Sequence, residues 1–387
     1  MGTERRDWLK AMRAEKGLTQ DALARRIQVD PGTVARWERG AQEIRVANQG
    51  PLAEALGVTV RQLISHLRPT PPKPSTQPVP DTPTNVAIRS LRSVIDGCRG
   101  LDHTVGPVGT LDIVRSQLAV GDRLRSMAAN DNERKPVVAM MAEIRQFEGW
   151  MNFDMGNVPT ARTAHARARE MAEAADDSAL VAYILGPSAA FIEIDSGHPK
   201  QGLDLAYASQ ARARRSGNRR LIAFTLAISA RAHAKLGEDR ICDQLLNEAA
   251  NELAAHNGWA TDPVWLNVFD ETALTGHTGS CYLDLGRPSE AVDLLSEQDN
   301  SSSAEFVRNR AIWWLDRAAG YQAMNEIEQA ATELTNALDL ISTTSSPRTR
   351  KKLQTVSNSL TEKAQNHPSV IDLTERIAHL DPGNEAS

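Results

Sequence analysis

Apolar and polar positions follow a helical period in a short segment that begins near residue 19. Thr19 is a residue type that caps helix N-termini, and the apolar side chains of Leu23 and Ile27 then fall on one side. Arg25 and Arg26 fall on the opposite side, toward solvent. This pattern predicts a short amphipathic helix.

A second segment of the same kind follows after a few residues. Asp30 is a good helix cap, and Pro31 stands at the first helical position, where its missing N–H costs nothing. Val34 and Trp37 are three residues apart and face one side, and Gly40 ends the helix. The two segments together predict a pair of helices joined by a tight turn.

The helix pair resembles the helix-turn-helix of the phage-repressor/Cro-like family, also called the XRE family. The resemblance extends from about Trp8 to Leu67, and four elements carry it: Leu18-Thr19-Gln20, Leu23-Ala24, Val34 and Trp37-Glu38-Arg39-Gly40. It implies a five-helix N-terminal domain, residues 1–68, that binds a palindromic operator in double-stranded DNA.

The resemblance also assigns roles by position. Its DNA-contacting positions are Gln20, Pro31, Gly32, Thr33, Arg36, Arg39 and Arg45. Gln20 would contact a phosphate, whereas the second helix would face the major groove. Pro31 and Gly32 offer no side-chain hydrogen bond, so direct reading of bases rests on Arg36, which suits guanine. Shape reading, or a loop contact from Gln42, Arg45 or Asn48, supplies the rest.

Charge and proline content divide the chain into three parts. Residues 1–68 hold 12 Lys and Arg against 8 Asp and Glu, whereas the whole chain has a net charge of −5. The basic part is therefore the part that resembles a DNA-binding domain. Seven prolines lie between Pro69 and Pro83, so residues 69–85 are expected to form an extended linker.

The rest of the chain, residues 86–387, carries an internal repeat that is clearest over residues 134–341. Five turn residues, each able to adopt the left-handed conformation that ends a helix, are spaced 41, 40, 49 and 39 apart: Gly156, Gly197, Gly237, Gly286 and Asn325. Small residues recur seven residues before and five residues after each turn residue, at positions where two helices would cross closely. The pattern resembles a tetratricopeptide repeat of longer period, which implies an all-α chain with a C-terminal α-solenoid.

Two helical hairpins are expected to flank the repeats. Residues 86–104 and 108–129 form the first, and residues 349–380 form the second, with a break at Asn366-His367-Pro368. As atypical terminal units, they would cover the exposed ends of the solenoid.

A ligand site in the repeats is suggested by carboxylates and aromatic residues. Six residues are candidates for it: Trp150, Asp154, Phe191, Asp195, Trp265 and Asp284. The three Asp residues stand two before a turn glycine, where they would face the concave surface. Two alternatives stay open: an Asp at this place can bond turn N–H groups, and the aromatic rings can fill the core.

The body of the chain also resembles a group of actinobacterial regulators that join this DNA-binding domain to a repeat domain. Five segments carry that resemblance: Gly149-Trp150, Asp154-Met-Gly156, Asp262-Pro-Val-Trp265, Asp270-Glu-Thr-Ala-Leu274 and Cys281-Tyr-Leu-Asp-Leu-Gly286. We therefore expect a transcription regulator whose repeats dimerise and sense a small ligand or peptide. The alternative is an adaptor whose repeats dock a partner protein. The chain shows no catalytic motif, metal-ligand spacing or cofactor motif, and no apolar run of membrane-spanning length, so we expect a cytoplasmic protein that is not an enzyme.

Overall fold

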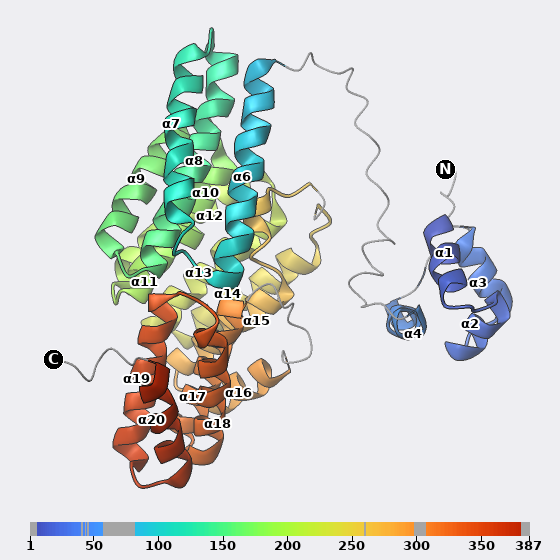
Figure 1. Ribbon diagram of the computed structural model, residues 1–387, viewed down its shortest axis with the longest axis vertical. Coiled ribbons are helices and arrows are strands. Elements are labelled where there is room, and N and C mark those ends of the chain that lie inside the picture. The colour runs from blue at the N-terminus through green and yellow to red at the C-terminus, as the bar shows by residue number, and fades with distance from the viewer. Residues whose placement is uncertain are drawn as a thin grey trace. The chain divides into compact units, whose positions relative to one another are not determined.

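The computed structural model describes residues 6–39, 42, 44, 46–56, 82–258, 261–297 and 307–380. The chain forms two compact units, residues 1–79 and 80–387, which we call the head and the body (Figure 1). Throughout the described residues the secondary structure is helical, without strands. The predicted all-α class is confirmed.

Four helices of the head are described: α1 (Asp7–Glu15), α2 (Gln20–Arg26), α3 (Pro31–Glu38) and α4 (Val46–Leu56). They enclose a small apolar core in which Leu9, Leu23, Val34, Trp37 and Leu52 are fully buried. These are the residues that the helical period places on the inner sides of the helices. The fifth predicted helix and most of the proline-rich linker lie outside the described residues.

The body begins with a hairpin of α6 (Pro83–Val105) and α7 (Leu111–Met127). Antiparallel helices then follow in order: α8 (Asp131–Asp154), α9 (Val158–Ala174), α10 (Ser178–Tyr183), α11 (Phe191–Asp195), α12 (Pro199–Ser216), α13 (Arg219–Lys235), α14 (Asp239–Ala254), α15 (Glu271–Asp284), α16 (Pro288–Ser296), α17 (Val307–Ala323), α18 (Ile327–Ser342), α19 (Pro347–Ala364) and α20 (Pro368–Leu380). A π-helical stretch, Ile184–Ala190, joins α10 to α11 without interruption.

The turn residues of the repeat end their helices as the sequence predicts. All five adopt a positive φ between 66° and 86°: Gly156, Gly197, Gly237, Gly286 and Asn325. Each separates two helices that pack side by side, for example α8 and α9, α13 and α14, or α17 and α18. The break before Pro368 is also confirmed, since α19 ends at Ala364 and α20 begins at Pro368.

Small residues stand where neighbouring helices approach most closely. A Cβ atom on Gly149 would lie 2.4 Å from the ring of His165, and one on Gly279 would lie 2.6 Å from Leu295. Such distances are far shorter than a van der Waals contact, so larger residues would force the helices apart. The predicted role of the small residues is confirmed at these crossings.

One described segment, Ser178–Asp195, is long and apolar enough to cross a membrane by length and composition. This corrects the expectation that the chain has no such run. In the body, 72% of the segment is buried among other helices, as in the core helix of a folded domain. Its Pro187 removes one backbone donor, which accounts for the wider π-helical turn at this place.

The first helices of the body contact helices near its C-terminal end. α6 packs against both α8 and α17, and α19 packs against α8. The turn after α6 is held in the same region, because the backbone N–H of Ser345 donates to the Val105 carbonyl at 2.9 Å. The helix pairs therefore curve tightly enough to bring their two ends together, and this closure decides which residues of the inner face stay accessible.

Candidate functional site

The helix pair α2–α3 begins at the two predicted caps. The Thr19 hydroxyl accepts a hydrogen bond from the Ala22 backbone N–H at 3.1 Å, and the Asp30 carboxylate accepts one from Gly32 at 2.9 Å. Each cap satisfies an N–H group that the first helical turn leaves without a partner. The two caps fix where α3 starts, and thereby which of its side chains face outward.

Arg36 is exposed on α3 and is held by two neighbours. Its Nε donates to Gln42 Oε1 at 2.8 Å, and its Nη2 donates to Thr33 Oγ1 at 2.9 Å. A guanidinium carries five N–H donors, so donors remain for a base edge. Gly32 leaves room for this arrangement, since a Cβ atom there would lie 2.9 Å from Asp30 Oδ1 and 3.2 Å from Arg36 Nη1. Sequence reasoning did not find that Gln42 positions Arg36.

Gln20 points into the head in this structure. Its Nε2 donates to Glu38 Oε2 at 2.6 Å, and Glu38 also accepts from Arg13 Nε at 2.6 Å. An amide group has two N–H donors, so the predicted phosphate contact of Gln20 remains a prediction. Glu38 is 6% exposed, and its role as the shared acceptor was not anticipated from the sequence.

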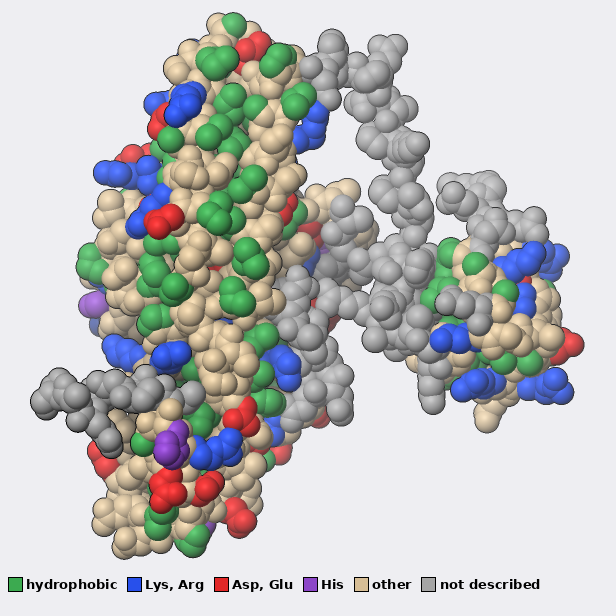
Figure 2. Space-filling view, viewed as in Figure 1, with side chains coloured by type: hydrophobic (Ala, Val, Ile, Leu, Met, Phe, Trp, Pro, Cys, Tyr) green, Lys and Arg blue, Asp and Glu red, His purple; other side chains and the backbone are tan. Residues whose placement is uncertain are grey.

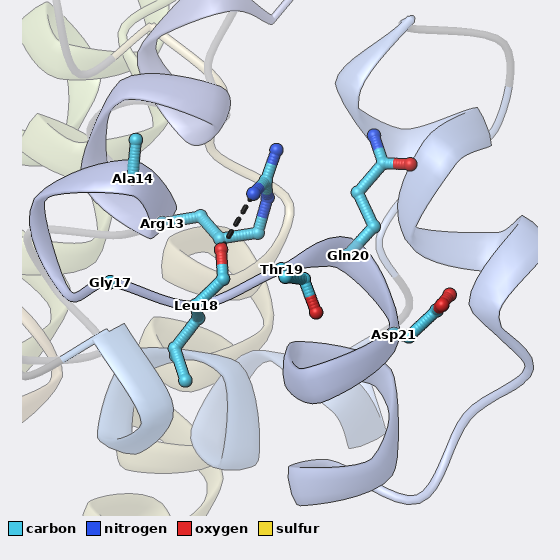
Figure 3. A pocket seen from close by; sticks show the side chains of 7 residues that line it. All are labelled: Arg13, Ala14, Gly17, Leu18, Thr19, Gln20 and Asp21. Carbon is cyan, nitrogen blue, oxygen red and sulfur yellow. Dashed lines mark hydrogen bonds between the residues drawn. The ribbon is translucent and has the colours of Figure 1, made fainter.

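An open hollow of about 410 Å³ lies at the start of α2 (Figure 3). Arg13, Thr19, Gln20 and Asp21 line it, and the Arg13 guanidinium donates to the Leu18 carbonyl at 2.7 Å. The hollow lies beside the first predicted DNA-contacting position.

Basic side chains are spread over the described surface of the head (Figure 2). Six of them are exposed: Lys10, Lys16, Arg25, Arg26, Arg36 and Arg39. Of the other predicted contacts, Pro31 is exposed, Gly32 and Thr33 are half-buried, and Arg45 lies outside the described residues. The helix pair thus presents its predicted positions on a surface with the charge that nucleic acid requires.

In the body, Asp154 does not face the concave surface as the sequence predicts. Its carboxylate is fully buried and accepts hydrogen bonds from Arg308 Nη1 and Arg348 Nε, each at 3.1 Å. Burial alone would raise the pKa of Asp154, but the attraction of the two guanidinium groups outweighs it, and the pKa lies below its ordinary value. The prediction that Asp154 faces an open groove is wrong, because α17 and α19 close over it.

Trp265 is also a core residue, with an exposed fraction of 5%. Its ring lies 4.6 Å from that of Tyr183, centroid to centroid. The alternative that these aromatics fill the core therefore describes Trp265. Trp150 and Phe191 remain half-buried, 5.9 Å apart, and Phe191 meets the His277 ring at 6.3 Å.

Asp195 and Asp284 keep access to solvent. Asp195 is exposed, whereas Asp284 is half-buried and accepts from Lys235 at 2.6 Å through Oδ1. Its Oδ2 lies 3.6 Å from Arg231 Nη1, too far for a hydrogen bond. Within the described part of the chain, this oxygen and the buried Nε and Nη1 of Arg231 have no hydrogen-bond partner. No local pattern in the sequence pointed to Arg231, which is one of three arginines in the alanine-rich helix α13.

Burial lowers the pKa of His277 to about 3, so its ring is neutral near pH 7. His277 lies between Phe191 and Phe224, whose ring centroids are 6.3 and 5.8 Å from its own. The inner side of α11, α13 and α15 thus combines aromatic rings, a neutral imidazole and an incompletely paired Arg231–Asp284 couple. In the described ranges, no group of three or more His, Cys, Asp or Glu is arranged to hold a metal ion.

Comparison with known families supports the assignment of the head. A family model described as helix-turn-helix matches residues 9–63. A comparison with curated proteins gives no match. The matched range contains most of α1, all of α2 to α4 and both caps. The chain therefore carries the XRE-type helix-turn-helix that the sequence predicts, which is the domain of a DNA-binding transcription regulator.

Proposed function

We propose that the chain is a one-component transcription regulator in which each part has a separate task. The head binds a palindromic operator, and the body joins two copies and senses a small ligand or short peptide. A ligand that changes the geometry of the dimer alters the spacing of the two heads, and only one spacing fits two half-sites on DNA. The protein acts in the cytoplasm and catalyses no reaction.

The observation that carries the DNA-binding proposal is the position of Arg36. It is exposed on the helix that resembles a recognition helix, and Thr33 and Gln42 hold its guanidinium in one orientation. A guanidinium held in this way loses less freedom when it binds two acceptors of a guanine. Because Pro31 and Gly32 carry no donors in their side chains, Arg36 makes the principal base contact of α3.

The inner side of α11, α13 and α15 supports the sensing proposal. Arg231 Nη1 and Asp284 Oδ2 face each other at 3.6 Å, and both atoms are buried without a hydrogen bond to any described residue, so a polar ligand group that inserts between them would complete both. An amide or an amino-acid-like group presents both complements, and Phe191 and Trp150 provide apolar contacts beside them. This chemistry fits a short peptide or another ligand that carries an amine or an amide.

The DNA-binding proposal is tested by selecting the preferred site from random duplexes and titrating it with the full chain. Arg36→Ala should weaken that site by about 1–3 kcal/mol and relax specificity at one base pair. Arg26→Ala should weaken specific and random DNA alike, if it contacts a phosphate. Equal affinity of wild type and Arg36→Ala for the selected site would refute the assignment.

The sensing proposal is tested by a thermal-shift screen with short synthetic peptides and a metabolite extract. A compound that stabilises the wild type should lose its effect on Asp284→Asn, while the matched control Asp204→Asn, an exposed carboxylate on α12, should respond fully. If no compound shifts the melting temperature and a protein partner co-purifies instead, the adaptor alternative replaces the sensor.

A further inference from the structure

Exposed apolar side chains gather on the α6–α7 hairpin. Eleven large apolar side chains are exposed in the described part of the chain, and eight of them belong to this hairpin or its turn: Val86, Val94, Leu101, Val105, Val108, Ile113, Val120 and Met127. Figure 2 shows hydrophobic side chains along this part of the body, where Figure 1 places α6 and α7. The other three, Tyr207, Val264 and Ile371, are isolated.

The exposed residues are spaced so that they form rows. Ile113, Val120 and Met127 are seven residues apart on α7, and Val94 and Leu101 are seven apart on α6. Seven residues span almost two helical turns, so these side chains lie on one side of each helix. A seven-residue spacing is typical of helices that pack against one another with knobs-into-holes contacts.

These rows are a second apolar face of the hairpin. Its inner face is already covered, since Ile88, Leu91 and Ile95 of α6 and Val114 and Leu118 of α7 are buried in one cluster with α8. The terminal hairpin at the other end has no such face, because α19–α20 exposes only Ile371 among its described large apolar side chains. A terminal unit that merely kept the solenoid soluble would have a polar outer face, as α19–α20 has.

The exposed area is large enough for a stable contact. The eight side chains, which are 39–78% exposed, amount to roughly 600 Å² of mainly apolar surface, the upper end of what a monomer displays without a partner, and the five in the two rows supply the larger part of it. Because α6 has 23 residues, the face is about 35 Å long, and with its intervening small residues it approaches the roughly 800 Å² per partner of a standard interface.

We propose that the α6–α7 hairpin is the surface through which two copies of the chain dimerise. The hairpin of one copy packs against that of its partner in an antiparallel arrangement, related by a two-fold axis. A two-fold contact joins a surface to itself, so an apolar row on one copy meets the same row on the other. This inference rests on the proposed function, which requires two heads for a palindromic operator.

The exposed charges favour the antiparallel arrangement. Arg89 and Arg92 lie near the start of α6, and Arg123 and Arg125 lie near the end of α7. All four are at the same end of the hairpin, where Asp122 balances one of them through its pair with Arg125 at 3.0 Å. A parallel dimer would bring these positive ends together. An antiparallel dimer instead places each of them beside the partner's other end, where Asp112 has a 95% exposed side chain 3.8 Å from Arg115 and the positive charge is smaller.

The same arrangement suits the route to the heads. The chain that leads to the head leaves each body at Pro83, the start of α6. In the antiparallel dimer the two starting points lie about one α6 length apart, about 35 Å, which matches the spacing of two half-sites one DNA turn apart.

The interface is tested with the full chain by size-exclusion chromatography with light scattering. The wild type, whose chain mass is 42.3 kDa, should elute as a dimer. Leu101→Glu combined with Val120→Glu should raise the dimer dissociation constant by roughly 100-fold or more, because a charge in each row must lose its water. Ile371→Glu, at a residue 46% exposed on the other terminal hairpin, should leave the dimer intact.

Two further measurements separate the outcomes. Circular dichroism should show unchanged helicity and melting for the double variant, because both residues are exposed. Asp112→Arg should weaken the dimer at low salt, and the dimer affinity should recover at high salt, where the repulsion is screened. An unchanged or tighter dimer in that variant overturns the antiparallel arrangement.

A monomeric wild type overturns the proposal, and the apolar face of the hairpin then contacts the head or another protein instead of a second copy. A double variant that is still dimeric overturns it as well, since the interface then lies elsewhere. If the double variant becomes monomeric while the wild type selects no DNA site, the interface stands and the proposed function fails.

Discussion

Arg308 and Asp154, which are 154 residues apart in the sequence, form a buried ion pair with an Nη1–Oδ2 distance of 3.1 Å. Arg308 also donates from Nη2 to Asp102 Oδ2 at 2.9 Å, and Asp154 also binds Arg348. The four residues come from α6, α8, α17 and α19. The network thus links the first helices of the body to the last ones, in the place where the sequence predicts an open groove.

Asp154→Asn should destabilise the body strongly. The amide keeps the shape of the carboxylate but removes the charge that balances Arg308 and Arg348, and breaking a buried ion pair typically costs about 3–5 kcal/mol. Urea unfolding of the full chain, followed by circular dichroism, measures the loss. Asp195→Asn is the matched control, because Asp195 is exposed and its replacement should change stability by less than about 0.5 kcal/mol. Equal stability of the two variants would contradict the structural role of Asp154.

His165 makes the stability of the body depend on pH. Burial lowers its pKa from 6.5 to about 4, and its Nε2 lies 3.1 Å from the Gln146 carbonyl oxygen. Between these two pKa values the unfolded chain binds the proton and the folded chain does not. Stability should therefore fall as the pH drops from 6.5 toward 4, by about 3 kcal/mol from this residue.

The pH effect is measured by urea unfolding at several values between pH 4 and pH 7. His165→Gln cannot titrate, so the difference in stability between it and the wild type should shrink as the pH falls. His103 and His277 also have pKa values lowered by burial, and they contribute equally to both proteins. A constant difference across this range would show that His165 is not the titrating group.

Glu38 should be a principal stabilising residue of the head. It accepts hydrogen bonds from both Arg13 and Gln20, and the Arg13 side chain is only 12% exposed. Glu38→Ala leaves that guanidinium without its counter-charge and should cost about 3 kcal/mol. Scanning calorimetry should show a lower melting temperature for the head, whereas the melting temperature of the body should stay the same. Asp21→Asn, an exposed change in the same unit, is expected to leave both transitions in place.

Gln42 should affect DNA binding only through Arg36. Gln42→Ala removes the acceptor at 2.8 Å from Arg36 Nε, and the freed side chain should lose about 1 kcal/mol of specific affinity while affinity for random DNA is unchanged. In the Arg36→Ala background the same change should have no further effect. Fluorescence anisotropy with the selected site measures all four proteins. An independent loss in the double variant would assign Gln42 its own DNA contact.

Local sequence signals predicted the head and the turns of the body well. Thr19 and Asp30 cap helices, and Gly156 adopts the left-handed turn, because each of these outcomes depends on backbone groups a few residues away. Gly149 was correctly expected at a close crossing for a similar reason, since a residue without a side chain is needed wherever two helices touch. The positions of Arg36 and Pro31 on α3 follow from its cap.

The environment of each carboxylate was decided by contacts between distant parts of the chain. Asp154, Asp195 and Asp284 occupy the same place in their repeats, yet the first is buried between two arginines, the second is exposed and the third is half-buried. Their local sequences do not distinguish these outcomes. The helical period and the turn residues determined which segments are helices and where they end, because these preferences act over one or two turns. Only the tertiary structure decided that α17 and α19 lie against α6 and α8, because that closure depends on the summed curvature of all the helix pairs.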